Sequence, residues 1–282
     1  MQNTNNIFTI QLEGLNVPQE ATYPMFLFLF FSYLFLIVAN VGIAVLVFVD
    51  KSLHQPMYIL FCNLSINDLF GNSIMIPRLL VDMLRPPSER LISYYECVGQ
   101  AFTTHMFSTT AHTLTVSAWG VAFVLVGILL GLTLRLGRCR TLIKSPYCDN
   151  AALFNLSCED VFINNVYGLT FTVLLFTGSI GSMVLTYTKI TVVCLTTKNK
   201  SLNNKALKTC STHLVVYLIF LFSGMSIITL HRFPEYSESR KIVAVLYHII
   251  PGSLNPIIYG MQSKEIKNFV SKVKLKKVLP LY

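Results

Sequence analysis

Four of the seven cysteines surround one polar stretch of the chain and are the residues best placed for covalent chemistry. They are Cys97, Cys139, Cys148 and Cys158, which flank or occupy residues 135–162. An even number of cysteines on one side of a fold indicates two disulfides formed in an oxidising compartment. Three pairings are open, and the alternative is four unpaired buried thiols. The sequence therefore predicts a loop held by disulfides, with the pairing undecided.

Patterns of catalytic and metal-binding residues are absent from the sequence. It contains no HExxH, no Walker loop, no Gly-rich dinucleotide motif and no serine elbow. His213 and His231 each lack a second metal ligand at a useful spacing. We therefore expect neither an enzyme nor a protein with a cofactor or a metal ion bound by such residues.

The polar loop also carries an N-glycosylation sequon, Asn155-Leu156-Ser157. Two further sequons, at Asn63 and Asn199, fall in an apolar segment and in a basic loop, where a glycosyl transferase would not reach them. Asn155 is therefore the predicted glycosylation site.

The composition indicates a membrane protein. Hydrophobic residues make up 53% of the 282 residues and charged residues only 12%, about half the charged share of a soluble domain. Residues 24–49 carry no charge, and this run exceeds the roughly 20 residues that a helix needs to cross a bilayer. It is also too long for a signal-peptide core, so it predicts a retained signal anchor. We expect an all-α, multi-pass protein forming one domain over residues 1–282, with apolar segments near 24–49, 57–81, 97–134, 163–195, 212–230 and 242–261.

The net charge of +9 is concentrated near the C-terminus, where six lysines follow Met261. Residues 263–278 interleave these lysines with apolar residues. This pattern predicts a basic amphipathic helix on anionic cytoplasmic lipid, and the alternative is a frayed tail. The basic residues form no patch interleaved with aromatic residues, so nucleic acid is not an expected partner.

Asp68 is an ionisable residue inside the apolar segment 57–81. A charge in the middle of a bilayer costs about 3 kcal/mol or more, so it should face polar groups. Asn40 and Asn255 lie in two other apolar segments and can supply such groups. The three residues predict either a structural hydrogen-bond cluster between helices or a functional polar pocket.

Segment 97–134 has an anomalous length. Its 38 residues are too many for one span and too few for two spans with a loop. A cramped hairpin with the N-terminus outside places 12 Lys and Arg residues inside and 10 outside. A single crossing with the N-terminus inside places 14 inside and 8 outside. Both arrangements obey the positive-inside tendency, so charge counting does not separate them.

Four blocks of sequence occur in a specific order: LHQPMY at 53–58, LSINDL at 64–69, KALKTCSTHL at 205–214 and PGSLNPIIY at 251–259. They resemble the first cytoplasmic loop and the second, sixth and seventh helices of the vertebrate odorant receptors, a family of rhodopsin-like G-protein-coupled receptors. The resemblance runs from about residue 8 to about residue 275. It implies a seven-helix receptor bundle.

One block of that family has no counterpart here. The family carries a Met-Ala-Tyr-Asp-Arg-Tyr-like stretch at the inner end of the third helix, followed by the second cytoplasmic loop. Here Ala111–Val116, which resembles the middle of the third helix, runs directly into Ser117–Gly120, which resembles the fourth helix around its tryptophan. The resemblance implies an internal deletion that leaves the third and fourth helices truncated and fused.

The resemblance also implies site residues, for each of which the alternative is ordinary helix packing. The upper third helix of the family faces the odorant cavity. The ligand-binding residues implied here are Thr104, His105, Ser108 and Thr109, with Tyr167, Met225 and Tyr247 as companions. The implied disulfides are Cys97–Cys148 and Cys139–Cys158, and Asn40, Asp68 and Asn255 would form a sodium-like pocket.

The function implied by the resemblance is that of an odorant-binding receptor in the plasma membrane, coupled to a heterotrimeric G protein. Because the Asp-Arg-Tyr block is missing, we expect impaired coupling. Because segment 97–134 is too short for two full spans and a turn, we also expect poor folding and retention of chains in the endoplasmic reticulum. One alternative is a non-signalling, pseudogene-like membrane protein of the same ancestry. A small transporter or channel is disfavoured, because the sequence lacks the internal repeats of many transporters.

Overall fold

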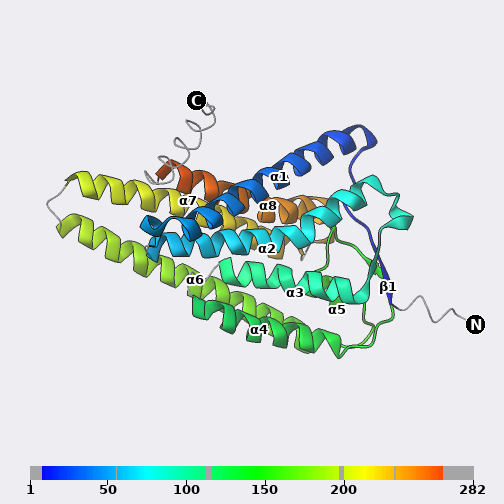
Figure 1. Ribbon diagram of the computed structural model, residues 1–282. Coiled ribbons are helices and arrows are strands. Elements are labelled where there is room, and N and C mark those ends of the chain that lie inside the picture. Colours follow the sequence, from blue (N-terminus) through cyan, green and yellow to red (C-terminus); the bar gives the residue numbers. More distant parts are fainter. Residues whose placement is uncertain (1–7, 55, 112–115, 197–199, 232, 263–282) are drawn as a thin grey trace, which may run out of the picture.

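The computed structural model describes residues 8–54, 56–111, 116–196, 200–231 and 233–262, and most of them are helical (Figure 1). The long helices are α1 (Gln19–Val49), α2 (Pro56–Leu84), α3 (Tyr94–Ala111), α4 (Val116–Leu134), α6 (Phe162–Thr196), α7 (Lys200–His231) and α8 (Ser237–Gln262). A short helix, α5 (Asn150–Phe154), lies in the loop between α4 and α6. The architecture is the helical membrane bundle that the composition predicts.

Among the residues that the structure describes, five helices are long and apolar enough to cross a membrane: α1, α2, α6, α7 and α8. Their outward faces carry exposed apolar side chains, such as Phe28, Val38 and Phe48 on α1, which suit contact with lipid. The predicted segments 24–49, 57–81, 163–195, 212–230 and 242–261 fall in these five helices. The predicted amphipathic tail, 263–278, lies outside the described residues.

Neighbouring helices form a continuous series. Helix α1 packs on α2 and α8, α8 packs on α7 and α2, and α2 packs on α3. Helix α4 packs on α3 and α6. The indole Nε1 of Trp119 on α4 also donates a hydrogen bond to Asn63 Oδ1 on α2, at 3.0 Å. The fourth helix is therefore tied to the second as well as to the third.

Helices α3 and α4 occupy the segment of anomalous length. They pack against each other as separate helices of 18 and 19 residues, so this segment has the hairpin arrangement rather than one continuous crossing. At 1.5 Å per residue they are about 27 Å and 29 Å long, whereas α6 is about 52 Å long. Figure 1 shows the α6–α7 pair projecting well past the ends of α3 and α4.

A small three-stranded sheet lies at the end of the bundle that carries the disulfides. Strand β1 (Thr9–Leu12) pairs antiparallel with β2 (Leu91–Ser93) and parallel with β3 (Leu142–Ile143). These strands were not predicted from the sequence, because two to four residues are too few to show alternation. The sheet joins the N-terminal segment to the loops that precede α3 and follow α4.

Candidate ligand cavity and inner polar cluster

A cavity of about 280 Å³ lies among α3, α6, α7 and α8. Five of the seven residues predicted to bind ligand line it: Thr104, His105, Ser108 and Thr109 from α3, and Tyr247 from α8. Apolar side chains from α6 and α7 complete much of the wall, among them Phe171, Leu175, Phe176 and Ile227. A mostly apolar wall with a few placed polar groups is typical of small-molecule sites.

Helical spacing explains why α3 supplies four of these residues. Thr104 and Ser108 are one turn apart, as are His105 and Thr109, so both pairs lie on the same side of the helix. The hydroxyls of Thr104, Ser108 and Thr109 donate to the carbonyl oxygens four residues earlier, at 2.8, 3.1 and 2.7 Å. Because those protons are held by the backbone, the hydroxyls offer mainly lone pairs to other partners.

Tyr167 and Met225, the other two predicted ligand residues, do not line the cavity. The Tyr167 hydroxyl donates to the Leu125 carbonyl on α4 at 3.1 Å, so Tyr167 joins two helices. The Met225 side chain is 47% exposed. Its neighbour Gly224 lines the cavity instead, because one residue along an α-helix turns the side chain by about 100°.

Four aromatic rings pack together where α3, α7 and α8 meet. Phe107 stacks on His248 with ring centroids 5.0 Å apart, and Phe220 stacks on Tyr247 at 4.4 Å. Phe107 also meets Phe220 and Tyr247 edge-on, at 6.0 and 6.2 Å. Tyr247 and His248 line the cavity. Only Tyr247 was predicted, because the other rings carry no motif and acquire their role from this packing.

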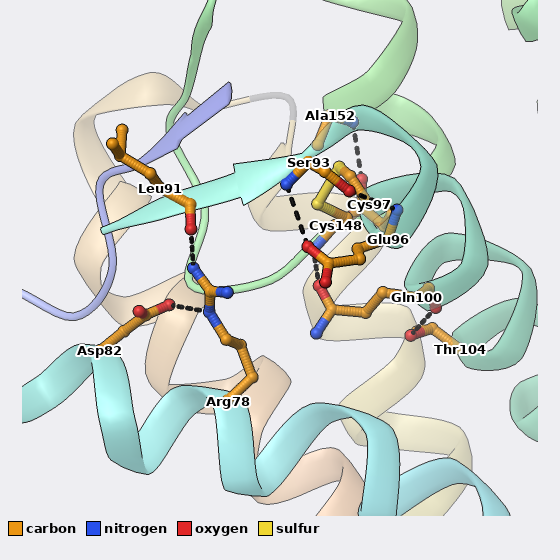
Figure 2. The surroundings of a disulfide bond; sticks show 11 residues. Arg78, Asp82, Leu91, Ser93, Glu96, Cys97, Gln100, Thr104, Cys148 and Ala152 are labelled. Carbon is orange, nitrogen blue, oxygen red and sulfur yellow. Dashed lines mark hydrogen bonds and ion pairs between the residues drawn. A yellow bond between two sulfur atoms is a disulfide. The ribbon is translucent and has the colours of Figure 1, made fainter. Parts of the chain in front are cut away.

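The Cys97–Cys148 disulfide fastens the loop after α4 to the start of α3 (Figure 2). One turn along α3, Gln100 Oε1 accepts a hydrogen bond from the Cys148 backbone N–H at 2.8 Å. A second disulfide joins Cys139 and Cys158. These are the two pairs that the family resemblance implies.

Tyr147, next to the first disulfide, forms part of the cavity wall. It is buried and meets His248 edge-on at 5.6 Å. Burial raises the pKa of the Tyr147 phenol far above its ordinary value, so the ring presents a neutral hydroxyl at physiological pH. The disulfide therefore positions one wall of the cavity.

Lys241 is a buried cation that was not predicted as part of any site. Its side chain is 1% exposed and lines the cavity. Its Nζ lies 3.0 Å from Glu13 Oε1 and 2.8 Å from Glu238 Oε1. Asn16 Nδ2 donates to both carboxylates, at 3.1 and 2.9 Å. These contacts hold the N-terminal segment against the start of α8, and no sequence signal marks them because Glu13 and Lys241 are far apart in the chain.

The three residues of the predicted polar pocket are all buried where α1, α2 and α8 meet. Asn255 Nδ2 donates to Asp68 Oδ2 at 3.0 Å. Asn40 does not bond Asp68; its Nδ2 donates to the Gly252 carbonyl at 2.9 Å. Asn40 Oδ1 and Asn72 Oδ1 are buried without a partner among the described residues. Carboxylate and amide oxygens are hard ligands that suit a small cation, and a sodium role for Asp68 stays a prediction.

Clusters of three or more His, Cys, Asp or Glu side chains with metal-site geometry are absent from the part of the chain that the structure describes. A transition-metal centre therefore has no candidate ligand set there.

Comparison with known proteins identifies the family. A family model described as olfactory receptor matches residues 111–277, which is more than half of the chain. The chain belongs to the olfactory receptor family. It is therefore of the G-protein-coupled receptor type rather than of an enzyme family.

Individual olfactory receptors match nearly the whole chain. Olfactory receptor 4Q2 of Homo sapiens is 33% identical over 93% of this chain and 92% of its own length. Olfactory receptor 5B12 of Homo sapiens is 27% identical over 96% of each chain. Olfactory receptor 8G17 of Mus musculus is 27% identical over 96% of this chain and 98% of its own.

Proposed function

We propose that this olfactory receptor binds small odorant molecules in the cavity among α3, α6, α7 and α8. The observation that carries the proposal is the convergence of five predicted ligand residues on one cavity of about 280 Å³. Those residues were implied by the family resemblance, whereas the cavity results from the packing of four helices. Two independent arguments thus point to one place.

G-protein coupling is the part of the receptor function that we propose to be lost. The family's block at the inner third helix and second cytoplasmic loop has no counterpart between α3, which ends at Ala111, and α4, which begins at Val116. The alignment with olfactory receptor 5B12 supports an internal deletion, since its 305 positions exceed the 282 residues of this chain. An allosteric switch needs an element that both sites can bias, and here the inner contact surface is incomplete.

The same short hairpin supports the proposal of poor delivery to the plasma membrane. Helices α3 and α4 have 18 and 19 residues and are about 27 Å and 29 Å long, slightly less than the roughly 30 Å of a bilayer core. Mismatch costs fractions of a kcal/mol per Å, and backbone groups left unpaired in lipid cost several kcal/mol each. We propose that many chains are retained in the endoplasmic reticulum. The second candidate, a non-signalling membrane protein of this family, is favoured by the same observation.

Binding and coupling are tested in separate experiments. Thermal unfolding of the purified chain in lipid nanodiscs, with and without each member of an odorant panel, measures binding. A cyclic-nucleotide reporter in cells measures coupling. We expect stabilisation by some odorants and no reporter response from the 282-residue chain.

A chimera tests whether loss of signalling is due to the missing sequence block or to a general folding defect. It carries the corresponding block of olfactory receptor 4Q2 between Val116 and Ser117, and its control carries a Gly-Ser insert of equal length at the same place. We expect the first insert alone to restore an odorant response. A clear response from the unmodified chain would show that the missing block is dispensable.

A further inference from the structure

We propose that ligands reach the candidate cavity from the aqueous side, through a second, outer hollow, and that the Arg240 side chain is the gate between the two. This inference rests on the proposed odorant binding and adds the route by which a ligand enters and leaves. Its test measures access to the cavity, so it does not require a bound odorant.

The outer hollow is larger than the cavity and lies at the end of the bundle that carries the disulfides. Its volume is about 1190 Å³, whereas that of the cavity is about 280 Å³. Four charged side chains that do not line the cavity form part of its wall: Glu13, Arg140, Lys144 and Glu238. Charged side chains are costly to place against lipid, so this hollow faces water.

The cavity and the outer hollow adjoin each other. Six residues line both of them: Ser145, Asp149, Phe154, Asn165, His231 and Arg240. The side chains of these residues form the partition between the two spaces. A ligand that crosses from the outer hollow into the cavity must therefore pass between them.

One side of the partition is held in place. Ser145 and Asp149 belong to the loop that the Cys97–Cys148 disulfide fastens to α3. Asp149 also caps α5, because its Oδ1 accepts a hydrogen bond from the Ala152 backbone N–H at 2.7 Å. This side of the partition can move little without breaking those links.

Arg240 closes the other side through two contacts. Its Nη1 contacts Nδ1 of the His231 ring at the end of α7, and its Nη2 donates to the Lys144 carbonyl oxygen at 3.2 Å. The guanidinium thus joins α8 to α7 and to the loop after α4. Unlike Lys241, it has no ion pair among the described residues. Arg240 is only partly buried, so water can replace both contacts when its side chain swings away.

A thiol placed inside the cavity measures access from water. Ser108 lines the cavity but not the outer hollow. The full chain carrying Ser108→Cys, in nanodiscs, is treated with two methanethiosulfonate reagents. One reagent carries a trimethylammonium group and the other a sulfonate, and these charges oppose passage through lipid. Rates are compared with those of the chain without Ser108→Cys, which subtracts labelling of the other cysteines. We expect both reagents to label Ser108→Cys.

Arg240→Met in the same background tests the gate. It removes both contacts and keeps an unbranched side chain, so both labelling rates should rise about tenfold, the effect of losing one hydrogen bond of a charged group. A change in electrostatic potential alone would raise the rate of the cationic reagent and lower that of the anionic one. The control Arg140→Met removes a guanidinium that lines only the outer hollow and should leave both rates nearly unchanged.

The outcomes separate this inference from the proposed function. No labelling of Ser108→Cys, labelling that Arg240→Met does not accelerate, or opposite changes of the two rates would overturn the gate. Entry from the lipid between α6 and α7 would then be favoured, and odorant binding would still be decided by thermal unfolding. Accelerated labelling in a chain that no panel odorant stabilises would support the gate and overturn odorant binding. If either variant fails to fold, Thr104→Cys, on the same cavity wall, or Arg240→Gln takes its place.

Discussion

Replacing Gly71 by alanine should destabilise this receptor, although alanine is the better helix former. A Cβ atom at Gly71 would lie 2.5 Å from Cδ2, 2.6 Å from Cγ and 2.8 Å from Cβ of Phe107. Phe107 is fully buried, and three other rings surround it. Since its Cβ is fixed to the backbone, a rotation of the ring cannot remove the clash. Helices α2 and α3 would have to move apart.

The size of the effect follows from two opposing contributions. Overpacking a close contact costs about 1–3 kcal/mol, and alanine gains up to about 1 kcal/mol over glycine in a helix. Gly127→Ala on α4 is the control, because its Cβ would meet nothing within 4 Å. Relative to that control, Gly71→Ala should be less stable by roughly 1–3 kcal/mol. At roughly 2–4 °C per kcal/mol for a chain of this size, its Tm should be lower by roughly 2–12 °C.

The assay is thermal unfolding of both variants in the same nanodiscs. The double variant Gly71→Ala with Phe107→Leu should recover part of the loss beyond additivity, because the two positions are in contact. If Gly71→Ala melts at or above the temperature of Gly127→Ala, the close contact between α2 and α3 is wrong.

Three further predictions concern the end of the bundle that carries the disulfides. Cys97→Ser removes a disulfide with a sequence separation of 51 and should lower the free energy of unfolding by about 4 kcal/mol. Cys139→Ser removes one with a separation of 19 and should lower it by about 3 kcal/mol. Peptide mapping that finds Cys97 bonded to Cys139 would contradict this pairing. Asn155 is exposed directly after α5, so a glycan is expected there. Asn155→Gln should abolish the gel shift that peptide-N-glycosidase produces in the wild-type chain. If the wild-type chain from cells shows no such shift, Asn155 is not glycosylated. Lys241→Met should lower the free energy of unfolding by roughly 1–3 kcal/mol, a value between those of an exposed and a fully buried ion pair, because the partners Glu13 and Glu238 are 31% and 49% exposed. Limited proteolysis should then cut the variant near Glu13 faster than the wild-type chain. The control Lys144→Met, at an exposed lysine, should leave the cleavage rate unchanged.

The membrane helices could be predicted from the sequence because each is a local property of a continuous apolar run. The end of α1 at Val49 matches the predicted boundary, since a charged residue follows it directly. The start of α7 at Lys200 lies well before the predicted residue 212. A helix that continues into a polar stretch shows no change in hydropathy at its true end, so apolar length alone cannot locate that end.

The site residues also differ in whether a local sequence pattern marks them. Those on α3 were implied by the family resemblance, and they line one cavity because helical spacing brings them to the same side of α3. Lys241 could not be predicted, since its ion pair with Glu13 joins residues that are far apart in the chain. Met225 was chosen from the correct helix, one residue away from the position that lines the cavity.

The two ends of the helical bundle differ in the cross-links that hold them. Two disulfides, the small sheet and the Lys241 ion pairs brace the end that contains the candidate ligand cavity. At the opposite end, α6 and α7 extend past α3 and α4 (Figure 1). The α7 residues that line the cavity, Gly224, Ile227, Ile228 and His231, lie in the last third of α7, toward the braced end. Coupling requires a neighbour that α7 can move against at the other end, and in the proposed function the family block that would supply this neighbour has no counterpart in the sequence. This difference between the two ends is the physical basis of our proposal that the chain binds odorant but does not activate a G protein.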